Sequence, residues 1–148
     1  MRFRDAVEAD LAAIVALLAD DELGGGREKV GLPLPDAYTV GFRRMVAQGG
    51  RIILMLDGDV VIGCLQLDVL YGVSTLGMAR AQVEGVRVAR NRRGEGLGAL
   101  LLQEAIREAK EAGCGVVQLT TNLSRTDAQR FYRGLGFVQS HAGMKLVI

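Results

Sequence analysis

One stretch of the sequence decides the fold: residues 86–98, which read VRVARNRRGEGLG. Val86 and Val88 close a strand pattern, glycines then recur at every second position, and a strongly periodic helix follows. The first N–H groups of a helix have no partner inside it, the helix dipole adds partial positive charge, and glycine lets the backbone approach an anion closely. The stretch therefore predicts an anion site, for which the plainer alternative is a glycine turn with a solvated basic face.

The helix after this stretch has the clearest amphipathic pattern in the chain. Its apolar positions recur every three to four residues and are Leu101, Leu102, Ala105, Ile106, Ala109 and Ala112. A strand over 116–121 and another helix follow, and Ser124 with Asp127 forms a capping box for that helix. Two short strands, around 137–141 and 144–148, are predicted to finish the chain.

The strand before the glycine-rich stretch changes faces partway along. Ala81 and Val83 share one parity, whereas Val86 and Val88 share the other. A strand with a period of two can change faces in this way only by inserting a residue, which is a β-bulge. Gly85 lies at the change and tolerates the backbone geometry that a bulge needs.

The first half of the chain predicts two helices followed by a meander of antiparallel strands. A strand at 2–4 is followed by a helix over roughly 8–20, which the run Leu23-Gly24-Gly25-Gly26 breaks, and by a second helix that Asp36 caps. A strand over 51–56 then leads into a hairpin turn at Asp57-Gly58, in which both central residues are expected to have positive φ. A return strand at 65–69 and a loop over 71–78 complete this half. We expect one mixed α/β domain over 1–148, with a mostly antiparallel twisted sheet flanked by helices.

Composition excludes several classes of protein. The net charge is +1, so no nucleic-acid partner is expected. Residues 1–8 carry acids, and no segment approaches the roughly 20 apolar residues of a membrane span, so neither a signal peptide nor a membrane partner is expected. Cys64 and Cys114 have no metal or redox spacing and are interpreted as packing residues. We expect a cytoplasmic protein without a bound metal, from a GC-rich bacterium because arginine outnumbers lysine and Ala and Gly are abundant.

Two common phosphate-binding motifs do not fit the glycine-rich stretch. A P-loop ends in Gly-Lys-Ser/Thr, whereas this loop continues with LGA at 97–99. The dinucleotide fingerprint is formally matched by GEGLGA at 94–99, but it expects an acidic residue at the end of the next strand, where the chain reads TTN at 120–122. A nicotinamide-dependent oxidoreductase is therefore disfavoured.

A third pattern fits along most of the chain. The stretch 86–98 resembles the pyrophosphate-binding motif of the GNAT N-acetyltransferase superfamily, whose core is Arg/Gln-x-x-Gly-x-Gly/Ala. The segment from Asn122 through Phe131-Tyr132 to Phe137 resembles the second signature of that superfamily. Both lie in the family's order of bulged strand, loop, helix, strand and helix. The segments 23–28 and 140–146 also resemble those of a bacterial subgroup. Arg90 departs from the pattern, because many members have proline there.

The resemblance implies that the protein binds acetyl-coenzyme A (acetyl-CoA). In the family the bulge separates the fourth strand from the fifth, and the pantetheine arm lies in the gap. Backbone groups of Val86 and Val88 would then bind the arm and polarise the thioester carbonyl, while Asn122 would bind pantetheine or orient a water. The pyrophosphate would accept hydrogen bonds from the backbone N–H groups of Arg93, Gly94, Glu95, Gly96, Leu97, Gly98 and Ala99.

The resemblance also implies the catalytic residues. Glu84 matches a position where the family often carries a glutamate that removes a proton from the acceptor amine, and Tyr132 matches its general acid, which protonates the departing thiolate. The alternatives are a solvent-facing strand residue for Glu84 and core packing beside Phe131 for Tyr132. His141 is a competing base, although a lone histidine in a terminal hairpin is more often structural.

These predictions converge on an N-acetyltransferase that transfers an acetyl group from acetyl-CoA to an amine by direct attack in a ternary complex. The alternative function is a non-catalytic module that senses acetyl-CoA or pairs with another protein. The acceptor amine, a small molecule or a protein amine, is expected to bind at the first two helices and the 71–78 loop. A homodimer is also expected.

Overall fold

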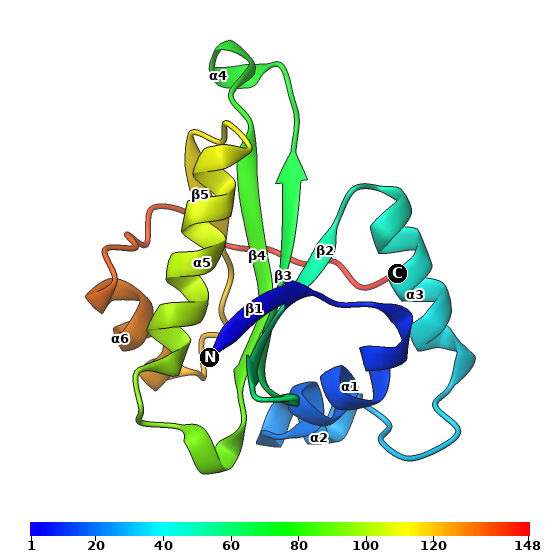
Figure 1. Cartoon of the computed structure of the whole chain (residues 1–148). Coiled ribbons are helices and arrows are strands. Elements are labelled where there is room, and N and C mark those ends of the chain that lie inside the picture. Colours follow the sequence, from blue (N-terminus) through cyan, green and yellow to red (C-terminus); the bar gives the residue numbers. More distant parts are fainter. The chain divides into compact units, whose positions relative to one another are not determined.

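The computed structural model describes residues 1–148, and Figure 1 follows the course of the chain. The chain divides into two compact units, residues 1–118 and 119–148. None of the helices combines the length and the apolar character needed to cross a membrane. Short 3₁₀ turns are labelled η, and the elements in order are β1 (Arg2–Asp5), η1 (Glu8–Asp10), α1 (Leu11–Ala19), α2 (Glu22–Arg27), α3 (Asp36–Ala47), β2 (Arg51–Asp57), β3 (Val60–Leu70), α4 (Ser74–Gly77), β4 (Arg80–Val88), η2 (Arg90–Arg92), α5 (Leu97–Glu111), β5 (Val116–Leu119) and α6 (Thr126–Gly134).

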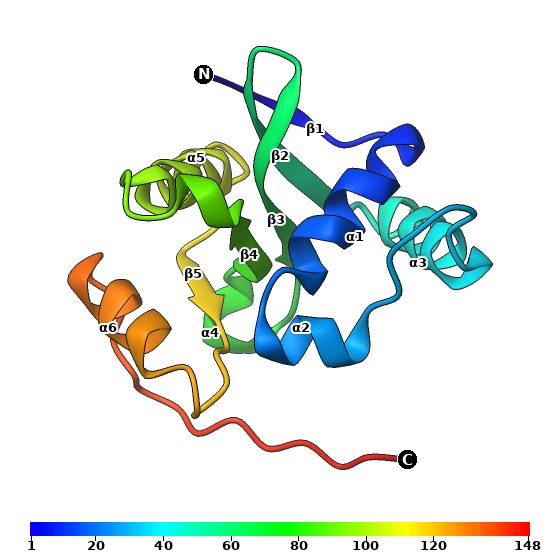
Figure 2. The ribbon, with the colours of Figure 1, turned by 90° about the horizontal axis from the view of Figure 1, so that it is seen from below.

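The sheet has five strands in the order β1-β2-β3-β4-β5, which confirms the predicted α/β fold class. The first four strands pair with their neighbours in antiparallel fashion. Helix α5 connects β4 to β5 and buries the apolar face that its periodicity predicted, including Leu101, Leu102 and Ala105. Helices α1 and α5 lie on opposite faces of the strands (Figure 2). The core therefore has two layers, one on each side of β2, β3 and β4.

The predicted β-bulge in β4 is confirmed. Cys64 of β3 pairs with Arg87 and Gln66 pairs with Glu84, so the pairing register shifts by one residue between them. Gly85 takes the extra place with φ of +60°. Because the bulge adds one residue, the valines after it return to the buried side that the residues before it occupied.

The β2–β3 hairpin differs in detail from the prediction. Asp57 is the last residue of β2, so the two central residues of the turn are Gly58 and Asp59. Only Gly58, with φ of +59°, lies in the left-handed region. A second register shift occurs where Met55 pairs with Gly63 and Leu56 with Val61, which the sequence did not indicate. A turn dipeptide marks the hairpin but does not fix which residues stand at its centre.

The glycine run that was predicted to break the first helix instead forms a short helix, α2. Asp21 caps it, since its side chain accepts a hydrogen bond of 2.5 Å from the Gly24 N–H. Gly24 is buried, and a Cβ there would lie 1.8 Å from the Leu18 carbonyl oxygen. Tertiary contact therefore overrides the low helix propensity of glycine. The prediction that Asp36 caps the next helix is wrong, because Asp36 is the first residue of α3, Pro35 occupies the cap position and no side-chain cap is formed.

The unit formed by residues 119–148 departs most from the prediction. The two strands predicted around 137–141 and 144–148 are absent, because residues 135–148 form no helix or strand. The Ser124–Asp127 capping box is also wrong: α6 begins after Arg125 without a side-chain cap. Asn122 organises the turn instead, and its side-chain oxygen accepts hydrogen bonds from the N–H and the hydroxyl of Ser124 at 2.9 and 2.7 Å.

Candidate functional site

The glycine-rich loop presents a continuous run of backbone donors. Gly94 and Gly96 adopt φ of +86° and +77°, a region that few residues other than glycine enter. Gly96 is the N-cap of α5, and the N–H groups of residues 94–99 donate to no acceptor within the chain. Leu97 is buried and anchors the first turn, while residues 93–96 are exposed. The loop therefore presents a run of unpaired N–H groups at the positive end of a helix dipole.

Arginine side chains tie this loop to the rest of the first unit. Arg92 donates to Asp57 at 2.8 Å and to Glu95 at 2.9 Å, and these bonds raise the pKa of Arg92. Arg90 donates from Nε to the Asp20 carboxylate at 3.0 Å, and Arg93 donates to the Asp20 carbonyl at 2.9 Å. The hydrogen bond from Arg90 holds the pKa of Asp20 below its ordinary value. The loop is thus fixed to the β2–β3 turn and to the C-terminal end of α1.

The bulged part of β4 has its carbonyl groups engaged by arginines. Arg87 donates from Nη1 to the Val86 carbonyl at 2.9 Å, and Arg93 donates from Nε to the Val88 carbonyl at 3.1 Å. Two hydrogen bonds join the segments of β4 and β5 near the start of β4. There the Gly115 N–H donates to the Ala79 carbonyl at 2.9 Å, and the Gln118 amide donates to Gln82 at 2.8 Å.

Glu84 lies immediately before the bulge and is exposed. It pairs across the ladder with Gln66, whose amide donates to Asp68 at 2.7 Å. Gln66 and Asp68 alternate along β3 with buried leucines, so they lie on the opposite face of the strand from those leucines. Cys64 lies on the same face as Gln66 and Asp68, and it packs in a core cluster with residues of α1. Glu84 therefore stands in a polar patch on the α1 side of the sheet.

The sequence reasoning missed an ion pair beneath the bulge. Arg87 Nε lies 3.3 Å from Asp21 Oδ2, and both side chains are largely buried, at 12% and 19% exposed. The same carboxylate caps α2, so one aspartate joins this helix to the bulged strand. Cys64 lies beside the bulge, 3.9 Å from the Gly85 carbonyl, and burial raises the pKa of its thiol to about 12. The thiol stays protonated, in keeping with the packing role predicted for it.

The remaining predicted residues lie in the unit 119–148. The ring of Tyr132 packs against Phe131 and Phe137, with centroid distances of 5.3 and 5.8 Å. Asn122 lies in the turn before α6, as described above. His141 is exposed, and its Nδ1 lies 2.7 Å from the Ser140 hydroxyl. The aromatic contacts and the turn are thus local to this unit.

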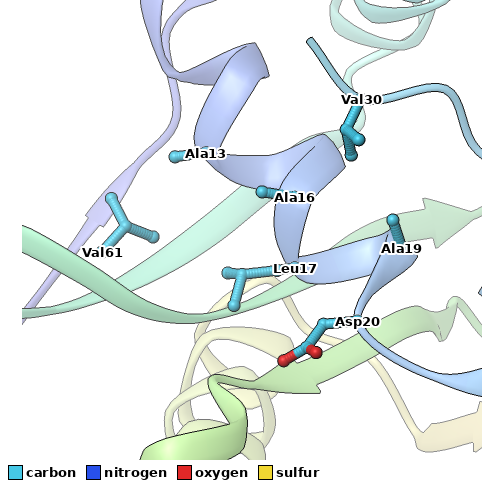
Figure 3. Close-up of a pocket in the computed structure, with 7 residues that line it drawn as sticks. All are labelled: Ala13, Ala16, Leu17, Ala19, Asp20, Val30 and Val61. Carbon is cyan, nitrogen blue, oxygen red and sulfur yellow. The ribbon is translucent and has the colours of Figure 1, made fainter. Parts of the chain in front are cut away.

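A shallow hollow of about 650 Å³ lies beside α1 (Figure 3). Its lining is mainly small or aliphatic and consists of Ala13, Ala16, Leu17, Ala19, Asp20, Val30 and Val61. The single carboxylate in this lining, Asp20, already pairs with Arg90 and Arg93. None of the predicted catalytic or cofactor-binding residues lines the hollow, whereas the first helix, where the acceptor was expected to bind, supplies most of its lining. No group of three or more His, Cys, Asp and Glu side chains in the chain could hold a metal ion.

Comparison with known proteins gives the family. The model of the acetyltransferase (GNAT) family matches residues 15–137. An aminoalkylphosphonate N-acetyltransferase of Salmonella typhimurium strain LT2 is 34% identical over 91 residues, which are 60% of this chain and only 56% of that protein.

Solved structures extend the likeness over the whole chain. A crystal structure of a transcriptional regulator from Bacillus halodurans C-125 is 40% identical, with a TM-score of 0.95 over 99% of each chain. A protein of Agrobacterium tumefaciens strain C58, whose name describes an acetyltransferase, is 25% identical with a TM-score of 0.86 over 100% of each chain. A predicted acetyltransferase of Clostridium acetobutylicum, solved with acetyl-CoA, is 16% identical with a TM-score of 0.78 over 99% of this chain and 95% of that one, and shares the fold. The family match spans the bulged strand, the glycine-rich loop and α6, so this chain belongs to the acetyltransferase (GNAT) family.

Proposed function

We propose that the protein is an N-acetyltransferase that moves an acetyl group from acetyl-CoA to an amine. The observation that carries this proposal is the run of unpaired N–H groups over residues 94–99, in a chain of this family. Such donors at a helix N-terminus suit the pyrophosphate of acetyl-CoA, and the glycines allow it to approach the backbone. Calorimetry with acetyl-CoA tests the first step, and absence of binding by the folded protein would refute the proposal.

The reaction would proceed by direct attack. The neutral nitrogen of the amine forms a bond to the thioester carbonyl carbon, and the C–S bond then breaks to release the thiolate of coenzyme A. Backbone groups at Val86 and Val88 would bind the pantetheine arm and stabilise the developing oxyanion. Glu84 would accept the proton that the amine loses, directly or through a water, and Tyr132 would donate a proton to the thiolate.

The identity of Glu84 as the base predicts a specific pH dependence. Glu84→Gln preserves the shape of the side chain, so affinity for acetyl-CoA should be unchanged. The rate should fall about tenfold or more and depend more steeply on high pH, because only the amine that is already neutral can react. Rates measured from neutral to alkaline pH, with released thiol as the readout, check this expectation.

His141→Ala is the matched comparison across the same pH range. A profile that is unaltered in Glu84→Gln but loses its acidic limb in His141→Ala would transfer the role of base to His141. If neither variant alters the profile, the acceptor loses its proton to solvent before it binds.

A further prediction concerns Asp20, which compensates the charge of two arginines at the loop. The Asp20 carboxylate is ionised at neutral pH, as an ordinary aspartate is, and the hydrogen bond from Arg90 lowers its pKa further. Asp20→Asn removes this negative charge beside Arg90 and Arg93 and should tighten acetyl-CoA binding by about three- to tenfold at low salt. Calorimetry at low and high salt measures the effect, which should disappear when the charges are screened.

The control is Asp59→Asn, the same change at a fully exposed side chain that pairs with Arg2. It should leave acetyl-CoA affinity unchanged at both salt concentrations. Weaker binding in Asp20→Asn would show instead that the aspartate holds the arginines in the arrangement that binds the cofactor.

The acceptor is best sought among small amines. The Salmonella relative acts on aminoalkylphosphonates, so these compounds head a screen that also contains amino acids, aminoglycosides and peptide amines. Release of thiol that depends on one class of acceptor identifies the substrate.

A regulatory role is the second candidate, because the Bacillus halodurans relative is described as a transcriptional regulator. This chain would then bind acetyl-CoA as a signal without turnover. Tight binding of acetyl-CoA, with no thiol released by any acceptor, would favour that function over catalysis.

A further inference from the structure

Two adjacent aspartates form the junction between α1 and α2. Asp20 is the C-cap of α1 (Figure 3), and Asp21 is the N-cap of α2. Each carboxylate pairs with an arginine from the end of β4 or the loop after it. Arg93 Nη2 lies 3.6 Å from Asp20 Oδ2, and Arg87 Nε lies 3.3 Å from Asp21 Oδ2. The junction therefore holds charged side chains from both the bulged strand and the glycine-rich loop.

The same two arginines also hold the backbone of the bulged strand. Arg87 donates from Nη1 to the Val86 carbonyl at 2.9 Å, and Arg93 donates from Nε to the Val88 carbonyl at 3.1 Å. A peptide group is planar, so a bond to its carbonyl also fixes the direction of the N–H in the same group. Each aspartate thus reaches one residue of the bulged strand through one arginine, and these are the residues whose backbone is proposed to bind the pantetheine arm.

The connection through Asp21 is the more shielded of the two. Both side chains of the Asp21–Arg87 pair are largely buried, whereas the Arg93 side chain is 43% exposed. Ion pairs that water reaches contribute little to the stability of an arrangement, but a largely buried charge is strongly destabilising once its partner is removed. Asp21 therefore keeps Arg87 in one place, and Arg87 in turn keeps the Val86 carbonyl in place.

We propose that Asp21 is a positioning residue for acetyl transfer, which acts through Arg87 on the backbone of Val86. It has this role only within the proposed function, in which backbone groups of β4 stabilise the developing oxyanion. Those groups lower the barrier only when they stand where the oxyanion forms, so a displaced bulge would slow the reaction. The proposed pyrophosphate site lies on the glycine-rich loop, so the affinity for acetyl-CoA would depend little on Asp21.

Asp21→Asn separates this role from the capping of α2. Asparagine caps a helix as well as aspartate does, so the hydrogen bond from the Gly24 N–H is kept while the charge opposite Arg87 is lost. We expect kcat to fall about tenfold, because the oxyanion donors are misplaced, and the affinity for acetyl-CoA to stay within about twofold of the wild type. Thiol release measures kcat, and calorimetry measures the affinity and the fraction of sites that bind.

Asp10→Asn is the matched control. The Asp10 side chain is 13% exposed, pairs with Arg4 at 2.7 Å and accepts a hydrogen bond from the Val7 N–H at 2.8 Å. The control thus loses the same charge and keeps the same kind of backbone bond, but its partner lies on β1, which β2 and β3 separate from β4. Both variants should have a lower melting temperature, and only Asp21→Asn should have a lower kcat. A normal kcat in Asp21→Asn, or an equal loss of kcat in both variants, would overturn the proposal.

A double-mutant cycle tests whether Asp21 acts through Arg87. Arg87→Met replaces the buried charge with an apolar side chain of similar length. If the two residues act as a unit, kcat of Asp21→Asn/Arg87→Met should fall no further than kcat of the more affected single variant. Losses that multiply would mean that Asp21 acts by another route, which contradicts the proposed connection.

Hydrogen exchange of the protein without ligand separates a failure of this proposal from a failure of the proposed function. The amides of residues 85–88 should exchange about tenfold faster in Asp21→Asn than in the wild type, and at the wild-type rate in Asp10→Asn. If the wild-type protein releases no thiol with any acceptor, acetyl transfer itself is refuted, and the exchange rates alone decide whether Asp21 holds the bulge. Unchanged exchange in Asp21→Asn would show that Asp21 does not position the strand, even in a protein that acetylates amines.

Discussion

Gly98→Asp should weaken acetyl-CoA binding by at least about a hundredfold, because two like charges about 4 Å apart repel by about 4 kcal/mol at the effective dielectric constant of a protein surface. Gly98 is the second residue of α5 and has negative φ, so its backbone accepts a side chain without strain. An aspartate near a helix N-terminus stabilises the helix by about 0.3–1 kcal/mol. The substitution is therefore expected to separate binding from folding, because the carboxylate would occupy the place of the pyrophosphate while the backbone of Gly98 needs no change of conformation.

The measurement is calorimetric affinity for acetyl-CoA, with the melting temperature as the test of folding. Gly98→Asn is the matched control, because it has nearly the same shape and no charge, and it should lose much less affinity. Gly96→Asp is less informative, since Gly96 has φ of +77° and any side chain there adds strain. Unchanged affinity in folded Gly98→Asp would mean that the pyrophosphate binds elsewhere.

Tyr132→Phe should reduce turnover about 10²-fold or more while leaving the fold intact, because loss of a general acid removes 10²–10⁴-fold of rate. The substitution keeps the ring, and with it the contacts to Phe131 and Phe137 at 5.3 and 5.8 Å. The melting temperature and the affinity for acetyl-CoA should therefore stay close to those of the wild type. Steady-state rates and thermal unfolding of the same preparation measure both effects.

Tyr71→Phe provides the control for removing a phenolic hydroxyl, since Tyr71 is 78% exposed in the loop after β3. Its turnover should be normal. If Tyr132→Phe is equally active, the residue serves only packing, and water protonates the thiolate. A large loss of stability in Tyr132→Phe would point instead to a structural hydrogen bond of the hydroxyl.

The sequence predicted best those features whose causes lie within a few residues. The glycine-rich loop, the start of α5 and the bulge at Gly85 all follow from local spacing, because helix periodicity, strand parity and left-handed backbone are properties of short segments. Resemblance then added roles for Glu84 and Tyr132 that no local pattern could supply. Those roles remain predictions.

The contacts that join distant residues escaped prediction. Asp20 lies 70 residues from Arg90 and meets it only because α1 ends beside the loop. Asp21 and Arg87 are likewise far apart in the chain, and each alone reads as an ordinary polar residue. Charge pairs of this kind produce no periodic pattern in the sequence, so the sequence does not predict them. Only the packing of α1 and α2 against the sheet brings their residues together.

What the sequence by itself determined is the family and the fold class, because both rest on the spacing of residues along short segments. The stretch proposed to bind pyrophosphate rests on the same kind of spacing and stays a prediction. What only the tertiary structure decided is the state of segments whose local preference is weak or needs a partner. Gly24 stands in a helix because nothing larger fits against Leu18, although glycine disfavours helices. Residues 144–148 were predicted to form a strand and yet form none, because a strand exists only when another edge supplies its hydrogen bonds.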